Sequence, residues 1–132
     1  MRILKKIILP TLLLTLFSFN FIDRSPKEIA FQAVQVQSIL REELYWIYIN
    51  NPTLENESNY VDAKYVEGLL LKIVNDNHLK NKQTVSEAAR VQSILKEELY
   101  SFSINSGTVI AYNIYVDSRY VESLILEIVE SS

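Results

Sequence analysis

The chain of 132 residues has no cysteine, only two glycines and three prolines. The lack of cysteine excludes disulfide bonds, thiolate metal sites, a cysteine nucleophile and a lipidated N-terminal cysteine. With only Gly68 and Gly107 available, we do not expect long flexible loops. The single histidine, His78, has only Asp76 nearby in the sequence, so we expect a solvated linker side chain rather than a metal ligand or general base.

Sequence signatures of catalysis are also missing. The chain contains no phosphate-binding loop, nucleophile elbow or zinc-binding pattern. The acid pairs Glu42-Glu43 and Glu97-Glu98 occupy adjacent positions, which point about 100° apart on a helix. We therefore expect solvated helix faces rather than paired acid and base groups. The sequence predicts no catalytic residue, no metal site and no cofactor, and we expect a protein that is not an enzyme.

The composition is typical of a globular and acidic protein. Apolar residues make up 48% of the chain and charged residues 22%, which argues against disorder. The formal net charge is −3, and residues 1–23 hold three basic side chains and one acidic side chain, so the remainder carries −5. This acidic balance argues against nucleic acid or an anionic membrane as a main partner.

Residues 1–23 have the layout of a secretory signal peptide. Three basic side chains within the first six residues precede an almost wholly apolar run from Ile7 to Phe19. Even extended to Ile22, this run is shorter than the ~20 residues that a spanning helix needs. No A-x-A cleavage pattern is present, so an uncleaved anchor is the alternative. We expect an exported protein, periplasmic or extracellular, which touches a membrane only through residues 1–22 if they are retained.

An internal duplication organises the rest of the chain. The ten residues from Val36 to Tyr45 return 55 positions later as Val91 to Tyr100, and the replacement of Arg41 by Lys96 is the only change. At this offset, 22 of the 39 residue pairs that begin at Val36 and end at Val74 are identical. A self-match at a fixed period indicates two copies of one structural unit.

The duplication also sets the expected domain boundaries. We expect repeat 1 at residues 25–76, a linker at residues 77–83 and repeat 2 at residues 84–132. One repeat of about 50 residues buries too little of its own surface to be stable alone. The two repeats are therefore expected to fold as one unit.

Each repeat begins with a helical pattern. In repeat 1, Ser25 and Glu28 form a capping box around a proline at the first helical position. Apolar residues then recur at helical spacing, and we expect Leu40 and its equivalent Leu95 to be buried. Gln37 and the acid pairs lie mostly off this apolar stripe. A second capping box, beginning at Thr84, is expected to open the corresponding helix of repeat 2.

The middle of each repeat has the composition of β-strands. Residues 45–49 are aromatic and β-branched, residues 101–104 alternate polar and apolar, and residues 108–116 are apolar on both alternations. A second helix is expected to begin in each repeat with Asp62 or Asp117 as its N-cap. We therefore expect each repeat to contain a helix, two strands and a second helix, in the order α-β-β-α. The predicted fold class is α+β, with helices covering one face of an antiparallel sheet and a pseudo-twofold axis between the repeats.

Repeat 2 resembles the BON domain, which occurs in tandem in exported bacterial envelope proteins. The resemblance covers residues 86–129, which read as a helix, a hairpin turning at Asn105-Ser106-Gly107, a strand and a second helix. It implies a binding or envelope-stabilising module without catalysis. It carries over no site residues.

The two repeats differ where the first helix meets the first expected strand. Tyr45, Trp46 and Tyr48 stand in repeat 1, whereas Ser101 and Ser103 replace the last two in repeat 2. On a strand, Trp46 and Tyr48 point to the same side and form an aromatic patch on the sheet face away from the helices. Because tyrosine and tryptophan dominate interface hot spots, the three aromatic residues are candidate interface residues. Packing in the core or at its rim is the ordinary role of such side chains, and the sequence favours it over an interface.

These features favour a small exported, non-catalytic binding or envelope-associated module. Its partner would be a protein or another envelope component. The alternative is a small-ligand carrier or an enzyme with a pocket between the repeats.

Overall fold

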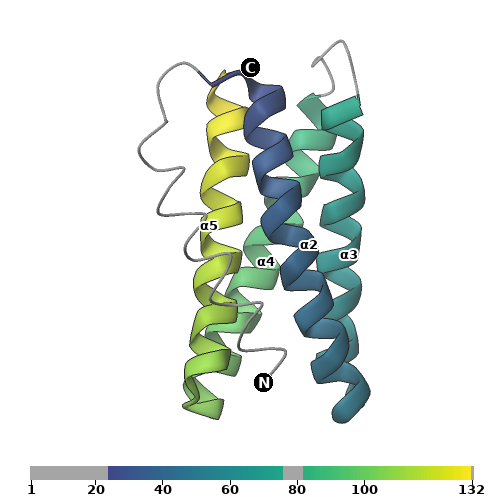
Figure 1. The fold of residues 1–132 in the computed structure, drawn as a ribbon, viewed down its shortest axis with the longest axis vertical. Coiled ribbons are helices and arrows are strands. Elements are labelled where there is room, and N and C mark those ends of the chain that lie inside the picture. The colour runs from purple at the N-terminus through teal and green to yellow at the C-terminus, as the bar shows by residue number, and fades with distance from the viewer. Residues whose placement is uncertain (1–23, 76–81, 132) are drawn as a thin grey trace.

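A computed structural model describes residues 24–75 and 82–131, which form a bundle of four helices (Figure 1). The helices are α2 (Pro26–Asn50), α3 (Leu54–Asn75), α4 (Lys82–Ser106) and α5 (Val109–Ser131). The predicted signal or anchor segment 1–23 and His78 lie outside the described residues. Helix α4 begins at Lys82, inside the segment predicted as the linker.

The four helices run alternately up and down around the bundle axis (Figure 1). Helix α2 packs against α3 and α5, and α4 packs against the same two helices, so α2 and α4 face each other across a diagonal. Short connections between consecutive helices favour this antiparallel arrangement of neighbours. Each repeat supplies one helical hairpin, either α2–α3 or α4–α5. Residues 55 positions apart therefore occupy equivalent places in the two hairpins.

The predicted α+β fold with an antiparallel sheet is wrong, because the segments assigned to strands are helical in the described chain. Residues 45–49 lie in α2, residues 101–104 lie in α4, and α5 begins at Val109. The β-propensity of aromatic and β-branched residues depends on context. Here Leu44 is buried in the same cluster against which Ile47 packs, so the inward face of α2 continues at helical spacing. Tertiary packing of that face outweighs the local propensity for a strand.

The start of α2 agrees with the sequence, whereas the start of α4 does not. Ser25 is the N-cap of α2, and its hydroxyl accepts a hydrogen bond from the Glu28 amide at 3.2 Å. The capping box predicted to begin at Thr84 instead lies inside α4, which starts at Lys82.

Both second helices begin earlier than predicted. The hydroxyls of the equivalent residues Thr53 and Thr108 accept hydrogen bonds from amides three residues further on, at 3.1 and 3.2 Å. These threonines precede the first residues of α3 and α5. The predicted caps Asp62 and Asp117 lie well inside the two helices. The segment 53–59, which the sequence leaves open as a weak edge strand or a loop, and the expected strand 108–116 therefore lie mostly in the first two turns of α3 and α5.

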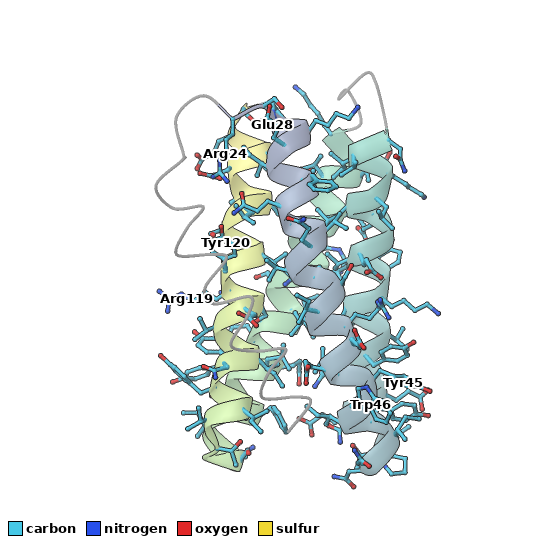
Figure 2. All side chains as sticks on the ribbon, viewed as in Figure 1. Arg24, Glu28, Tyr45, Trp46, Arg119 and Tyr120 are labelled. Carbon is cyan, nitrogen blue, oxygen red and sulfur yellow. The ribbon has the colours of Figure 1, made fainter. Side chains whose placement is uncertain are left out.

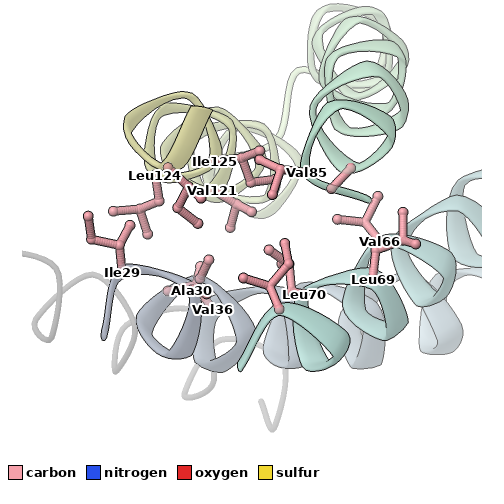
Figure 3. Close-up of a cluster of buried hydrophobic side chains, with 14 of the residues drawn as sticks. Ile29, Ala30, Val36, Val66, Leu69, Leu70, Val85, Val121, Leu124 and Ile125 are labelled. Atoms are coloured by element: carbon pink, nitrogen blue, oxygen red, sulfur yellow. The ribbon is translucent and has the colours of Figure 1, made fainter. Parts of the chain in front are cut away.

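The interior contains two apolar clusters. The larger cluster lies toward the start of α2, where side chains from all four helices point at one another (Figure 3). The smaller cluster lies toward the two hairpin turns and contains Leu40 and Leu95. Both leucines are buried as predicted, although in a bundle core rather than under a sheet. Complete burial of a leucine side chain contributes about 1.5–3 kcal/mol.

A pair of glutamines lies across the bundle diagonal between the two clusters. Gln37 and Gln92 are equivalent residues, and both are fully buried. Gln37 Nε2 donates a hydrogen bond to Gln92 Oε1 at 3.0 Å. Gln37 also donates to the Ala63 carbonyl at 3.1 Å, and Gln92 donates to the equivalent Ser118 carbonyl at 3.0 Å. The contacts of one hairpin are thus repeated by the other about a pseudo-twofold axis, and the expectation that Gln37 lies off the buried face is wrong.

Ion pairs inside each hairpin follow the same symmetry. Arg41 Nε lies 2.7 Å from Glu67 Oε1, and the equivalent Lys96 Nζ lies 3.2 Å from Glu122 Oε1. Each pair links the first helix of a hairpin to its second helix. The single substitution within the duplicated decapeptide therefore preserves a cation that faces a glutamate.

Candidate functional site at the aromatic tip

Both hairpin turns lie at one end of the bundle, opposite the start of α2 (Figure 1). We call this end, formed by residues 44–61 and 99–116, the aromatic tip. Its 36 residues include two charged side chains, Glu55 and Glu57, and no basic side chain. They also include six of the eight tyrosines and the only tryptophan. Aromatic side chains are therefore concentrated where charge is almost absent.

The first hairpin gathers four aromatic rings at the tip. The rings of Tyr45 and Tyr60 have centroids 5.2 Å apart, and those of Tyr48 and Tyr60 are stacked at 6.3 Å with an interplanar angle of 9°. Trp46 meets Tyr45 edge-on at 6.1 Å. Figure 2 shows Tyr45 and Trp46 near the lower end of α2, remote from Arg24 at the other end. Such aromatic pairs each contribute about 0.5–1.5 kcal/mol beyond the burial of their area.

The second hairpin has a similar cluster, which is formed by partly different residues. Tyr100 and Tyr115 have centroids 5.3 Å apart, which reproduces the Tyr45–Tyr60 contact of the first hairpin. Tyr112 adds a further ring, 6.3 Å from Tyr115. Each hairpin therefore carries a tyrosine cluster at its turn, although the repeats differ in sequence there.

Aliphatic side chains are exposed around both turns. Leu54 and its equivalent Val109 open α3 and α5, with 87% and 70% of their surface exposed. Ile49 and its equivalent Ile104 lie in the last turns of α2 and α4, with 48% and 62% exposed. The duplication thus places a pair of exposed aliphatic residues beside each tyrosine cluster.

The three candidate interface residues come together, but not in the predicted way. Trp46 and Tyr48 are two residues apart on a helix, which separates their directions by about 200°, so the shared strand face is wrong. Tyr45 and Tyr48, three residues apart, instead lie on one side of α2 and both meet Tyr60. Tyr60, which belongs to α3, is not among the predicted interface residues. Its return as Tyr115 was the available signal.

The carboxylate of Glu57 accepts a hydrogen bond from one of these tyrosines and raises its pKa. The Tyr48 hydroxyl lies 3.3 Å from Glu57 Oε2 and donates a hydrogen bond to it. The negative charge of Glu57 is the largest cause that raises the pKa of Tyr48 above its ordinary value. The phenol therefore stays protonated and acts as a donor at the rim of the first hairpin.

Two carboxyl groups are buried just behind the tip. Asp117 of α5 and Glu43 of α2 are both almost completely buried, so the predicted solvated face for Glu43 is wrong. Burial, and secondly the charge of Glu43, raise the pKa of Asp117 from 3.8 to about 7. At neutral pH this site therefore takes up and releases a proton. The pair lies between the two hairpins, since α2 and α5 belong to different repeats.

The equivalent acid pair on the other side of the bundle is nearer to water. Asp62 is half-buried, and Glu98 is exposed. Burial is the largest cause that raises the pKa of Asp62, and the negative charge of Glu98 raises it further. The positive charge of Arg90 acts in the opposite direction. An acid pair between the hairpins is thus a property of the duplicated unit, and the two copies differ in how far water reaches it.

The opposite end of the bundle carries a groove of about 540 Å³. It is lined by residues between Arg24 and Gln35 and by Val74, all from the first hairpin or the residues before it. It is therefore not the pocket between the repeats that the sequence left open. Within residues 24–75 and 82–131, no three acidic or histidine side chains group as metal ligands would. No helix in these two ranges is long and apolar enough to cross a membrane.

The chain matches no protein family, no curated protein and no solved structure. The resemblance to the BON domain is therefore not tested by these comparisons. The hairpin strands that it implies on either side of Gly107 fall in α4 and α5. The case for a function rests on the geometry of the tip.

Proposed function

We propose that this protein is a small exported binding module without catalytic activity, which contacts a protein or another component of the cell envelope through its aromatic tip. The observation that carries the proposal is the collection of exposed aliphatic and aromatic side chains among 36 residues with only two charges. Groups of exposed apolar side chains mark interaction sites in many proteins. Tyrosine and tryptophan also supply much of the binding energy at interfaces.

The remainder of the bundle supports the proposal as a scaffold. The apolar cluster at the far end and the Gln37–Gln92 pair fix the two hairpins against each other. Side chains on packed helices are held more rigidly than side chains on loops, which favours binding. The alternative of a ligand carrier or enzyme with a pocket between the repeats gains no support from the groove, because one repeat alone forms it.

Site-specific photo-cross-linking in producing cells tests the contact surface. A photoreactive phenylalanine analogue at Tyr100 should form a discrete adduct, whereas the same analogue at Leu126 should not. The two side chains are matched controls, since 47% and 45% of their surfaces are exposed. Equal labelling from both positions, or adducts from Leu126 alone, would contradict a contact at the tip.

A substitution that copies one repeat into the other tests the same surface by binding. Trp46→Ser combined with Tyr48→Ser reproduces the serines of repeat 2 at these positions. The variant should fold, because both side chains are only partly buried, and its cross-linking from Tyr100 should weaken. If the double variant unfolds, the two residues are core residues and not a contact surface.

Export is tested separately by the intact mass of the protein recovered outside the cytoplasm. The proposal expects loss of at least the first 18 residues, or recovery of the full chain in the membrane fraction if the segment is an anchor. Full-length chain confined to the cytoplasm would contradict export.

A further inference from the structure

The side chains of the tip are layered along the bundle axis. Leu54 and Val109 stand at the first positions of α3 and α5 and are highly exposed. Tyr60 and Tyr115 follow six residues later, which is about 9 Å along a helix. In the second hairpin, the first exposed charged side chain on α5 is Arg119, ten residues or about 15 Å from the helix start. In the second hairpin the order from the outside inward is therefore aliphatic, aromatic and charged, whereas in the first hairpin the two glutamates of the tip come before Tyr60.

The order in the second hairpin matches the polarity profile of a lipid bilayer surface. The interfacial layer that separates hydrocarbon from water is about 5–8 Å thick on each side of a membrane. Tyrosine and tryptophan are enriched at this level, because their rings are apolar and their hydroxyl or N–H groups need water or headgroups. With Leu54 and Val109 inserted about 2–4 Å past the edge of the hydrocarbon, the tyrosine clusters about 9 Å behind them fall within the headgroup layer.

The charge of the tip selects the type of lipid. Polybasic segments are the usual means of binding anionic lipids, and residues 44–61 and 99–116 contain no basic side chain. Glu55 and Glu57 would be repelled by a negative surface. The complementary surface is therefore one whose headgroups carry no net charge.

The geometry of the two turns favours a flat partner. Both turns lie at the same end of the bundle (Figure 1). Each turn presents an equivalent pair of exposed aliphatic residues. A planar surface can contact both turns at once. The overall affinity then exceeds that of either turn alone, because the second contact forms within the same complex. A pseudo-twofold axis along the bundle would then stand roughly perpendicular to that surface.

We propose that the partner of the aromatic tip is the interfacial layer of a bilayer with net-neutral headgroups, into which the aliphatic residues at both turns insert. This inference rests on the proposed function, since it names the partner of the same surface. The insertion is shallow and leaves the four helices intact outside the hydrocarbon.

Trp46 provides a direct test, because it is the only tryptophan and lies at the tip. Its fluorescence in the full chain reports on the tip even if residues 1–23 also bind lipid. Vesicles of phosphatidylcholine should shift its emission to shorter wavelength, and brominated phosphatidylcholine should quench it. Vesicles enriched in phosphatidylglycerol should give a weaker response at low salt.

Two matched double variants identify the residues that insert. Leu54→Ser with Val109→Ser should reduce vesicle partitioning, measured through Trp46, by about tenfold or more, since losing one inserted aliphatic side chain costs about that factor. Leu71→Ser with Leu126→Ser should leave it unchanged. These control leucines are also equivalent and exposed residues, but they lie away from the turns. Circular dichroism should show that both variants remain folded.

Three results would overturn the inference. Vesicle binding without a change in Trp46 emission would place the contact elsewhere in the chain. A stronger response to anionic than to neutral vesicles would contradict the charge argument. No response to any vesicle, together with cross-linking from Tyr100 to a protein, would make the partner a protein and leave the proposed function standing.

Discussion

Replacing Asp117 with asparagine should stabilise the protein at neutral pH. The folded state raises the pKa of this buried carboxyl from 3.8 to about 7, so folding favours its protonated form. The associated stability is fully present below about pH 4 and is lost as the pH rises through about 7. The difference of about three pH units corresponds to about 4 kcal/mol at 1.36 kcal/mol per unit. Asparagine keeps the shape of the neutral acid and does not titrate.

Urea unfolding at pH 4 and at pH 7.5 measures this effect. At pH 7.5 the Asp117→Asn variant should have a free energy of unfolding up to about 4 kcal/mol above that of the parent. At pH 4 the two proteins should agree within about 1 kcal/mol, since both then carry a neutral side chain. Asp62→Asn is the matched control: the pKa of Asp62 is raised in the same direction, but the residue is nearer to water, so its effect should be smaller.

Coincident pH profiles for the parent and Asp117→Asn would refute this reasoning. They would mean that the carboxyl is hydrated, or that it does not lie beside Glu43 between the hairpins. An equal effect from Asp62→Asn would show that the two sides of the bundle do not differ in burial.

Three further predictions concern the symmetry of the bundle. Gln37→Leu alone should lower the free energy of unfolding by about 1–3 kcal/mol, because it leaves the buried Gln92 Oε1 without its donor. The double variant Gln37→Leu with Gln92→Leu should lie within about 1 kcal/mol of the parent. If urea unfolding shows that the two substitutions have additive costs, the pairing is contradicted. Leu40→Ala and Leu95→Ala should each cost about 2–5 kcal/mol, and a loss below about 0.5 kcal/mol at either would mean that it is not a core position. Residues 84–132 expressed alone should lack a sharp thermal transition, since they hold only one hairpin; a cooperative melt by circular dichroism at low concentration would show that one repeat is sufficient.

Much of the helical framework could be predicted from the sequence. The fixed offset of 55 residues identified the repeating unit, and the spacing of apolar residues placed Leu40 and Leu95 in the core. The cap at Ser25 was also correct, because its chemistry depends only on local residues. These features arise from contacts close in sequence or from direct comparison of the two copies.

The strand predictions are wrong because the local composition favours strands, whereas the spacing of the buried residues is that of a helix. Residues 108–116 are rich in β-branched and aromatic side chains, yet Ala111, Ile114, Val121 and Ile125 are buried at intervals of a helical face. That spacing runs without a break through the assumed boundary between strand and helix. A helix of more than five turns buries this face, which a strand followed by a separate helix could not do.

The aromatic site was recognised only in part, and the buried polar groups were missed. Tyr45, Trp46 and Tyr48 stood out by their contrast with repeat 2, but their partner Tyr60 depends on how α3 packs beside α2. Gln37 is expected off the buried stripe, because that stripe is defined by apolar residues alone. Its burial is stabilised by a glutamine 55 residues away, a contact that only the assembled hairpins create.

Amide hydrogen exchange of the full chain, with and without vesicles prepared from cell envelopes, tests the central claim most directly. Such vesicles present both lipids and envelope proteins, so the measurement does not depend on which of them is the partner. The account predicts added protection within residues 44–61 and 99–116 and little change at the start of α2. Protection confined to the groove between Arg24 and Gln35, with none at the two hairpin turns, would contradict the assignment of function to the aromatic tip.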